Sequence, residues 1–313
     1  LYKISGDDTL LLMCPQAKVG THTIHEDTTH IREYAFENCT GITTVDIPKN
    51  VTEIKTSAFN GTDSLNAINV SEDNEKFASA DGALYDDVNK TLIKYPLGKT
   101  ASEYVVMDGT VTIAESTFTN NEYLTKVTLP QSLESIGAYA FDDVPLEQIT
   151  IPSNVEQIDV GAFYGTDIKE ISIPSKVKVL NATFKGCMDL QKVTLSEGVE
   201  TLENTFEGCH ALTTITIPAS VTSIIGAFSD CTSLEHIGVS EGNTHFMGHK
   251  GVLYDEIEKS LVAYPGKKSD RTYTVIAGTE KIGPGAFKGN SHIVKVILPE
   301  GLKTIGHQAF AYC

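Results

Sequence analysis

The sequence predicts a β-rich solenoid of coils about 22 residues long, with β-hairpin insertions, in a single elongated domain. Three observations carry this prediction. A phenylalanine recurs at nearly constant spacing, each interval repeats the same short alternating apolar pattern, and two longer intervals have the same length and matching residues. Together these features indicate stacked coils interrupted twice by an insertion.

The phenylalanine follows Ala or Thr in every interval, and successive marks lie 23, 59, 23, 22, 21, 22, 22, 59 and 23 residues apart. Self-similarity at such a period is typical of solenoids, whose units bury their apolar edges only by stacking on one another. The marks are Phe36, Phe59, Phe118, Phe141, Phe163, Phe184, Phe206, Phe228, Phe287 and Phe310.

Each short interval predicts two sides of a coil. After Phe206, Ile215 and Ile217 alternate with polar residues, which indicates a strand with one buried face. Pro218 ends that strand, because proline has no N–H to donate to a ladder. An apolar pair three residues apart then leads to the next mark, and we expect it to form a second extended or tightly turned side.

The two 59-residue intervals align without a gap at an offset of 169. Both contain Gly-x-Leu-Tyr-Asp, a polar stretch and Leu-x-x-Tyr-Pro, which predict a hairpin with its turn near 87–89 or 256–258. We therefore expect one solenoid over 1–313, with hairpin insertions at about 71–105 and 240–274 and a truncated third copy at 1–20.

The pattern Ala-Phe-x-x-Cys-x-x-Leu-x-x-Ile-x-Ile-Pro-x-x-Val-x-x-Ile, with the Leu-Tyr and Tyr-Pro insertions, resembles the BspA-type leucine-rich repeats of bacterial cell-surface proteins from Ile31 onward. This resemblance implies a leucine-rich-repeat solenoid located extracellularly or on the cell surface. It implies an attachment module that binds a host matrix or microbial surface protein through its repeat surface. A passive structural spacer and a glycan-binding accessory module are the alternatives.

The net charge of −17 argues against phosphate-rich partners, since a negative surface repels nucleic acid and anionic lipid. The apolar stretches, such as 10–13, are far shorter than the roughly 20 residues that span a bilayer. We expect no nucleic-acid partner, no membrane insertion in this segment and no cofactor.

The remaining chemistry predicts no enzyme and no metal site. There is no Gly-x-Ser-x-Gly elbow and no His-Glu-x-x-His motif, and no Cys-x-x-Cys spacing. We interpret the clustered histidines His22, His25 and His30 as solvated loop residues. Five cysteines lie three residues after a phenylalanine mark, a position that we interpret as a small buried slot: Cys39, Cys187, Cys209, Cys231 and Cys313.

The candidate binding surface is the outward face of the repeated strand, because residues between a buried pair point to solvent. Small hydroxyl residues dominate one outward row, which is also what plain β-propensity favours. The predicted binding residues are Asp46, Lys126, Thr128, Gln148, Thr150, Glu170, Ser172, Lys192, Thr194, Thr214, Thr216 and His236. No aromatic residue lies in these rows, whereas tyrosines recur in the insertions, where we expect them to pack the hairpins first.

Overall fold

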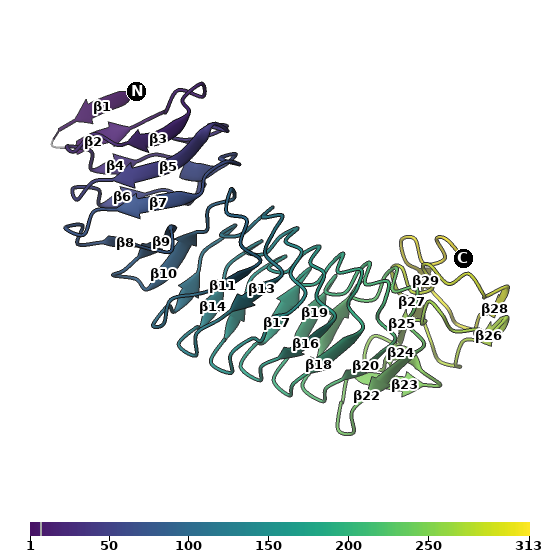
Figure 1. The fold of residues 1–313 in the computed structure, drawn as a ribbon. Helices are drawn as coiled ribbons and strands as arrows, with labels where there is room; N and C mark the ends of the chain where they lie inside the picture. The colour runs from purple at the N-terminus through teal and green to yellow at the C-terminus, as the bar shows by residue number, and fades with distance from the viewer. Residues whose placement is uncertain (7) are drawn as a thin grey trace. The chain divides into compact units, whose positions relative to one another are not determined.

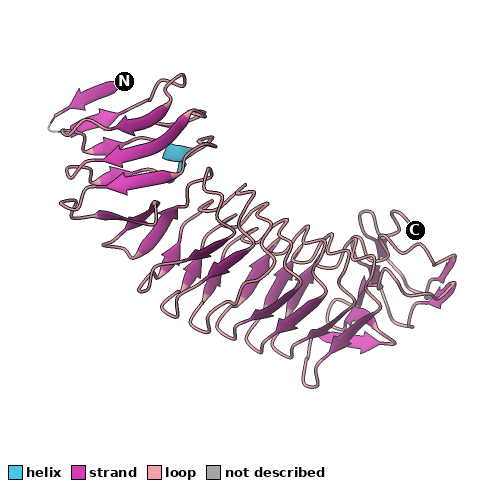
Figure 2. Ribbon diagram, viewed as in Figure 1, coloured by secondary structure: helices cyan, strands magenta, loops and turns pink. Residues whose placement is uncertain are grey.

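The computed structural model describes residues 1–6 and 8–313, and these residues contain strands, turns and one short 3₁₀ helix but no α-helix (Figure 2). They form two compact units, Leu1–Pro145 and Leu146–Cys313. Each unit is a stack of short coils, so the predicted β-rich solenoid is confirmed. The assignment of 1–313 to one domain and the insertion boundaries stay predictions.

The first unit begins with an antiparallel pair and continues with parallel strands from successive coils (Figure 1). Its strands are β1 (Tyr2–Ser5), β2 (Asp8–Leu11), β3 (Gly20–Thr23), β4 (His30–Ile31), β5 (Ile42–Ile47), β6 (Glu53–Ile54), β7 (Ala67–Val70), β8 (Phe77–Ala80), β9 (Ala83–Asp86), β10 (Thr91–Lys94), β11 (Glu103–Val105), β12 (Thr112–Ile113), β13 (Lys126–Thr128) and β14 (Ser135–Ile136), with the 3₁₀ helix η1 at Thr56–Phe59.

The second unit has the same construction, with two parallel sheets on the two sides of its coils. Its strands are β15 (Gln157–Ile158), β16 (Glu170–Ile173), β17 (Val179–Asn181), β18 (Lys192–Leu195), β19 (Thr201–Glu203), β20 (Thr214–Ile217), β21 (Ser223–Ile225), β22 (His236–Val239), β23 (Phe246–His249), β24 (Val252–Asp255), β25 (Ser260–Ala263), β26 (Thr272–Thr274), β27 (Lys281–Ile282), β28 (Lys295–Ile297) and β29 (Thr304–Ile305).

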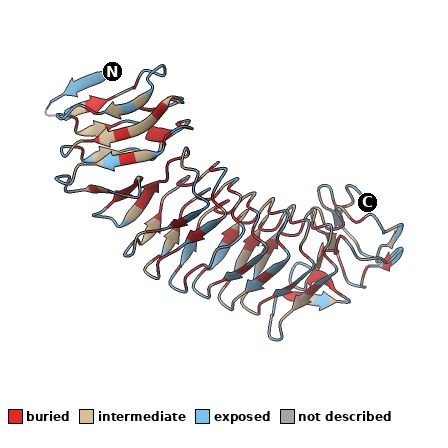
Figure 3. Ribbon diagram, viewed as in Figure 1, coloured by how far each residue is buried: buried red, intermediate tan, exposed pale blue. Residues whose placement is uncertain are grey.

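The repeated apolar pattern produces one buried row on each side of the coil (Figure 3). In β16, β18 and β20 the alternating residues Ile171, Val193 and Ile215 are buried and their neighbours are exposed. Parallel pairing of β17, β19 and β21 stacks Leu180, Leu202 and Ile224 on the other side. The two predicted sides of the coil are therefore both short strands.

The recurring phenylalanine forms a stack through the core of each unit. In the second unit the Phe184 ring lies 5.5 Å from that of Phe163 and 6.0 Å from that of Phe206, with ring planes within 6° of parallel. In the first unit the Phe36 and Phe59 rings are 5.2 Å apart. A buried aromatic stack requires a ring at the same place in every coil, which is why the spacing is so constant.

Both insertions are three-stranded antiparallel units, β8–β9–β10 and β23–β24–β25. Their second turns lie at the predicted positions, where Asp86 accepts a hydrogen bond from the Asn89 amide and Asp255 from the Glu258 amide, each at 2.7 Å. The Gly82 carbonyl of the first turn accepts a bond of 2.8 Å from the Ile68 amide, and thereby anchors the hairpin to the preceding coil.

The insertion tyrosines pack the hairpins, as predicted. The hydroxyls of Tyr85 and Tyr104 lie 2.6 Å apart, and those of Tyr254 and Tyr273 lie 2.7 Å apart. All four side chains are buried, and burial raises the pKa of each phenol above its ordinary value. Each pair therefore satisfies two buried hydroxyls at once.

Candidate binding surface

The outward face of the second unit is a regular ladder formed by β16, β18, β20 and β22, which we call the second-unit ladder. Parallel register aligns Glu170 with Lys192, which aligns with Thr214 and then with His236. A second row contains hydroxyl groups. It consists of Ser172, Thr194 and Thr216. Parallel strands lie about 4.8 Å apart, so the face presents evenly spaced polar groups.

A shallow depression of about 230 Å³ lies on this ladder. Its polar lining comes from two rows of side chains. The Lys192 ammonium and the Glu170 carboxylate are 3.7 Å apart, and these side chains are 68% and 70% exposed. A pair so exposed contributes little to stability, and both groups stay available to a ligand. The depression is lined in part by Thr150, Glu170, Ser172, Lys192 and Thr194.

The structure brings the predicted residues together only in part. Gln148 and Thr150 are exposed, and Thr150 reaches the depression. Lys126 and Thr128 lie in β13 of the first unit, where the Lys126 ammonium is 3.4 Å from the Glu103 carboxylate. Asp46 lies in β5 of the same unit, on a separate sheet. The second unit therefore collects the larger set.

Asp46 differs from the other predicted residues because its carboxylate is already engaged. One oxygen accepts a hydrogen bond from the Thr23 hydroxyl and the other from the Asn69 amide, both at 2.9 Å. These bonds cross between neighbouring coils, since β3, β5 and β7 are in register. Asp46 thus joins three coils, and less of its hydrogen-bonding capacity remains for a ligand.

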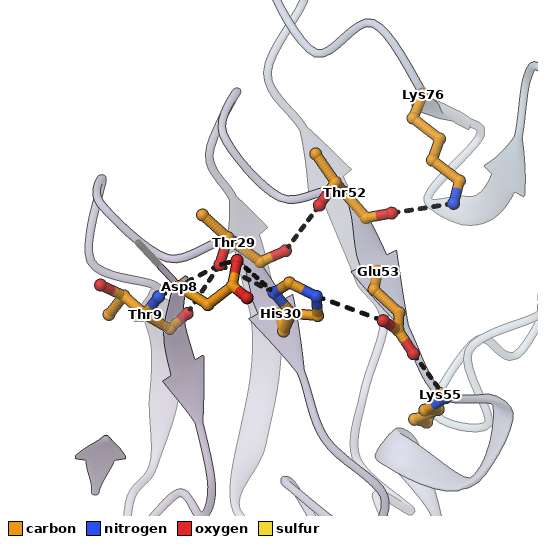
Figure 4. A network of polar contacts seen from close by, with 8 residues as sticks. All are labelled: Asp8, Thr9, Thr29, His30, Thr52, Glu53, Lys55 and Lys76. Carbon is orange, nitrogen blue, oxygen red and sulfur yellow. Dashed lines mark hydrogen bonds and ion pairs between the residues drawn. The ribbon is translucent and has the colours of Figure 1, made fainter. Parts of the chain in front are cut away.

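The expectation of solvated loop histidines is wrong for His30. This half-buried residue lies in β4, and its ring nitrogens are 3.4 Å from Asp8 and 3.2 Å from Glu53 (Figure 4). The Lys55 ammonium contacts Glu53 and holds the pKa of that carboxyl below its usual range. The sequence separates these residues by about one coil, and stacking brings them into one polar network.

His22 also departs from that expectation. It lies in β3, with its ring 5.5 Å from that of Phe36 and its Nδ1 atom 3.7 Å from the Cys14 thiol. Burial lowers the pKa of His22, which favours the neutral imidazole. His25, in contrast, is exposed and in a turn, as expected. The alignment of successive coils pairs His22 with the buried Val45, and this alignment is the sequence signal that could have indicated the burial of His22.

The predicted cysteine slot is confirmed for four of its five members, which are buried: Cys39, Cys187, Cys209 and Cys231. In the second unit each of these thiols donates to a phenylalanine carbonyl of the preceding coil at 3.1 Å. Burial raises the pKa of Cys187 and Cys231 to about 12, so neither forms the reactive thiolate near neutral pH. Cys313 is the exception, because its side chain is exposed.

Two further findings bear on the surface. Within residues 1–6 and 8–313, no cluster of three or more His, Cys, Asp or Glu side chains is arranged to hold a metal ion. In the same part of the chain, no helix has the length and apolar character to cross a bilayer.

The repeat pattern shows the protein family to which the chain belongs. The model of the BspA type leucine rich repeat region matches six copies, over residues 15–83, 160–249 and 267–313, which together make up more than half of the chain. The chain belongs to this family. The matched residues contain eight of the ten phenylalanine marks, and Phe118 and Phe141 lie outside them. A search of the curated proteins finds no match.

Two solved structures show the same fold. The pneumococcal vaccine antigen PcpA is similar with a TM-score of 0.66 at 25% identity, over 75% of this chain and 65% of that one. A leucine-rich repeat protein from Eubacterium ventriosum is similar with a TM-score of 0.54 at 22% identity, over 94% of this chain and 64% of that one. This chain therefore spans just under two thirds of either structure.

Proposed function

We propose that this protein is an attachment module that binds a host matrix protein or a microbial surface protein through the second-unit ladder. The observation that carries the proposal is the exposed, in-register face of β16, β18, β20 and β22 with its polar depression. Repeat solenoids commonly bind macromolecules over such extended faces. The binding residues predicted from the sequence belong to this proposal.

The polar groups of the ladder support a protein ligand. Hydroxyls of Thr150, Ser172 and Thr194 both donate and accept hydrogen bonds, and the adjacent Glu170 and Lys192 supply one charge of each sign. An extended partner would meet donors, acceptors and charges at one-coil intervals. Complementary charges of this kind set orientation and specificity more than affinity.

The proposal includes a non-enzymatic role at the cell surface or outside the cell. The thiols of Cys187 and Cys231 are protonated near neutral pH, and no acid, base and nucleophile group was recognised in the sequence. The location is supported by the family and by the similar pneumococcal protein, which is described as a vaccine antigen.

The test is saturable binding of the full chain to immobilised fibronectin, laminin, collagen and a bacterial surface-protein extract. Lys192→Glu places a like charge beside Glu170 on the ladder and is expected to weaken binding at least about tenfold. Lys178→Glu is the matched control. It makes the same charge change in the preceding coil, but next to β17 on the other sheet.

Three outcomes count against the proposal. Equal loss of binding in Lys192→Glu and Lys178→Glu would indicate a general charge effect instead of a ladder contact. Absence of binding to every coated surface would favour a spacer that only projects other parts of a larger protein. Turnover of any coating by the purified chain would contradict the non-enzymatic role.

A further inference from the structure

The first unit contains a larger concavity lined mainly by turns, which we call the insertion notch. It has a volume of about 730 Å³, within the range of small-ligand sites. Three turns meet there, at 61–66, 97–98 and 120–123, and the middle one follows the hairpin insertion. The polar and aromatic lining residues are Asp63, Ser64, Asn66, Asn120, Glu122 and Tyr123.

The turns of the notch are fixed in place. The buried Asn121 side chain accepts hydrogen bonds from the amides of Tyr123 and Leu124 at 3.0 and 2.9 Å, which sets the turn that carries Tyr123. Gly98 donates from its amide to the Leu65 carbonyl at 2.7 Å. A Cβ atom at Gly98 would meet the backbone of Ser64 at 2.5 Å, so a larger residue at this place would require the two turns to move apart.

The side chains that face the notch have unused bonding capacity. Across residues 1–6 and 8–313, no hydrogen bond or ion pair engages the carboxylates of Asp63 and Glu122 or the hydroxyl of Tyr123. The Tyr123 side chain is 43% exposed, which leaves part of an aromatic ring open to solvent. The Asn120 amide adds hydrogen-bond donors, and the Asn66 amide keeps one free N–H, because its nitrogen also donates to the Ser64 carbonyl at 3.2 Å.

The geometry points to a binding site for a neutral saccharide in the insertion notch. A sugar ring presents an apolar C–H face and an edge of hydroxyls, each of which both donates and accepts. Tyr123 offers a ring for the face, the carboxylates of Asp63 and Glu122 offer acceptors, and the two asparagine amides offer donors. The two carboxylates disfavour sulfated or sialylated glycans by charge repulsion.

A cationic peptide would be recognised less completely. Lysine and arginine side chains donate hydrogen bonds but accept none. They would satisfy Asp63 and Glu122 and contact the Tyr123 ring, but only the backbone carbonyls of such a peptide could accept from the Asn120 amide, since the Asn66 amide already donates to the Ser64 carbonyl at 3.2 Å. A neutral saccharide uses both kinds of group.

The second insertion has an ion pair at the same place. At an offset of 169, Lys267 and Glu235 stand where the first unit has Gly98 and Asn66, and their charged groups form an ion pair of 2.8 Å. His292 takes the place of Tyr123. The repeat therefore supplies a matched control position within the same chain. The notch is independent of the ladder, so either proposal can fail without the other.

The experiment is saturation-transfer NMR and calorimetric titration of the full chain with lactose, maltose and N,N′-diacetylchitobiose. We expect at least one to bind with a Kd on the order of 1 mM, typical of a weak small-ligand site. Tyr123→Ala is expected to weaken it about tenfold or more, and Tyr123→Phe to retain most of it. His292→Ala should leave the affinity unchanged.

The overturning results are equally specific. The proposal fails if none of the three disaccharides binds, or if Tyr123→Ala binds as tightly as the unmodified chain. It also fails if a hexalysine peptide binds at the notch, with loss in Tyr123→Ala and strong salt dependence, while the disaccharides do not. Because the Tyr123 side chain is 43% exposed and its hydroxyl has no hydrogen-bond partner among the described residues, circular dichroism and thermal unfolding of the variant should match those of the unmodified chain.

Discussion

The two hairpin insertions have the same architecture but different surroundings. Each contains three antiparallel strands, a buried tyrosine pair and a tyrosine whose ring packs against a core phenylalanine. They differ in the hydrogen bonding of one tyrosine hydroxyl. Tyr264 donates to Asp270 at 3.2 Å, whereas the buried Tyr95 hydroxyl has no hydrogen-bond partner in the described part of the chain.

A second difference between the insertions concerns Lys94, the residue before Tyr95. Lys94 in β10 is buried and its ammonium donates to the Ser116 carbonyl at 3.2 Å, and Ala263 takes this place in the second insertion. The repeat therefore specifies the packed interior, while the polar groups around it differ between the two insertions. The insertion notch belongs to that divergent part.

The largest expected effect on stability tests the phenylalanine packing that both insertions share. Phe118→Ala and Phe287→Ala each remove a ring that is fully buried between a tyrosine and the next phenylalanine. We expect each to lower the free energy of unfolding by about 3–5 kcal/mol. Urea unfolding followed by circular dichroism measures this. A loss in one insertion and none in the other would show that the cores are not equivalent.

The next largest effect tests the desolvation of the buried Lys94 ammonium. Desolvation lowers the pKa of Lys94 to about 8 from 10.5, so the folded state disfavours the charged form. The penalty is full below pH 8, decreases as the pH rises from 8 to 10.5, and vanishes above that range. Lys94→Met should therefore stabilise the protein by about 2–3 kcal/mol at pH 7, after allowance for the lost hydrogen bond.

The measurement is the difference in unfolding free energy between Lys94→Met and the unmodified chain at pH 7, 9 and 10.5. The difference should fall steadily over this range. Ala263→Met introduces methionine at the equivalent place without removing an amine and should give no such pH dependence. A constant difference for Lys94→Met would mean that the amine is not desolvated.

A smaller effect tests the tyrosine hydroxyls. Ala101→Asp introduces the acceptor that Tyr264 has in Asp270, and it should stabilise the first insertion by up to about 1 kcal/mol. Asp270→Ala should cost the second insertion a similar amount. Thermal unfolding detects both changes. If Ala101→Asp destabilises while Asp270→Ala has no effect, the two tyrosines are not in equivalent environments.

The sequence predicted those parts of the fold that depend on local period. The phenylalanine marks, the paired strands of each coil and the hairpin turns after Asp86 and Asp255 all follow from residues close together in the chain. The contacts of His22 and His30 do not follow from the local sequence, because their partners come from neighbouring coils. The candidate ladder could be predicted because strand alternation fixes which residues point outward.

The insertion notch could not be predicted from the sequence. Its lining comes from three turns separated by the hairpin, and Tyr123 is not part of the repeated apolar pattern. Contacts between residues distant in the sequence, such as that of Gly98 with Leu65 and that of Asn121 with Leu97, show that these turns meet. Aligning the two insertions would have revealed that Gly98 and Asn66 replace Lys267 and Glu235, but not that a cavity results.

Carboxyl footprinting of the full chain, with and without a saturating matrix-protein ligand, tests the ladder most directly. Glu170 lies on the ladder and Glu200 next to β19 on the other sheet, and both side chains are at least half exposed. We expect ligand binding to slow carbodiimide labelling of Glu170 and to leave that of Glu200 unchanged. Protection of Glu200 with Glu170 still fully labelled would contradict it.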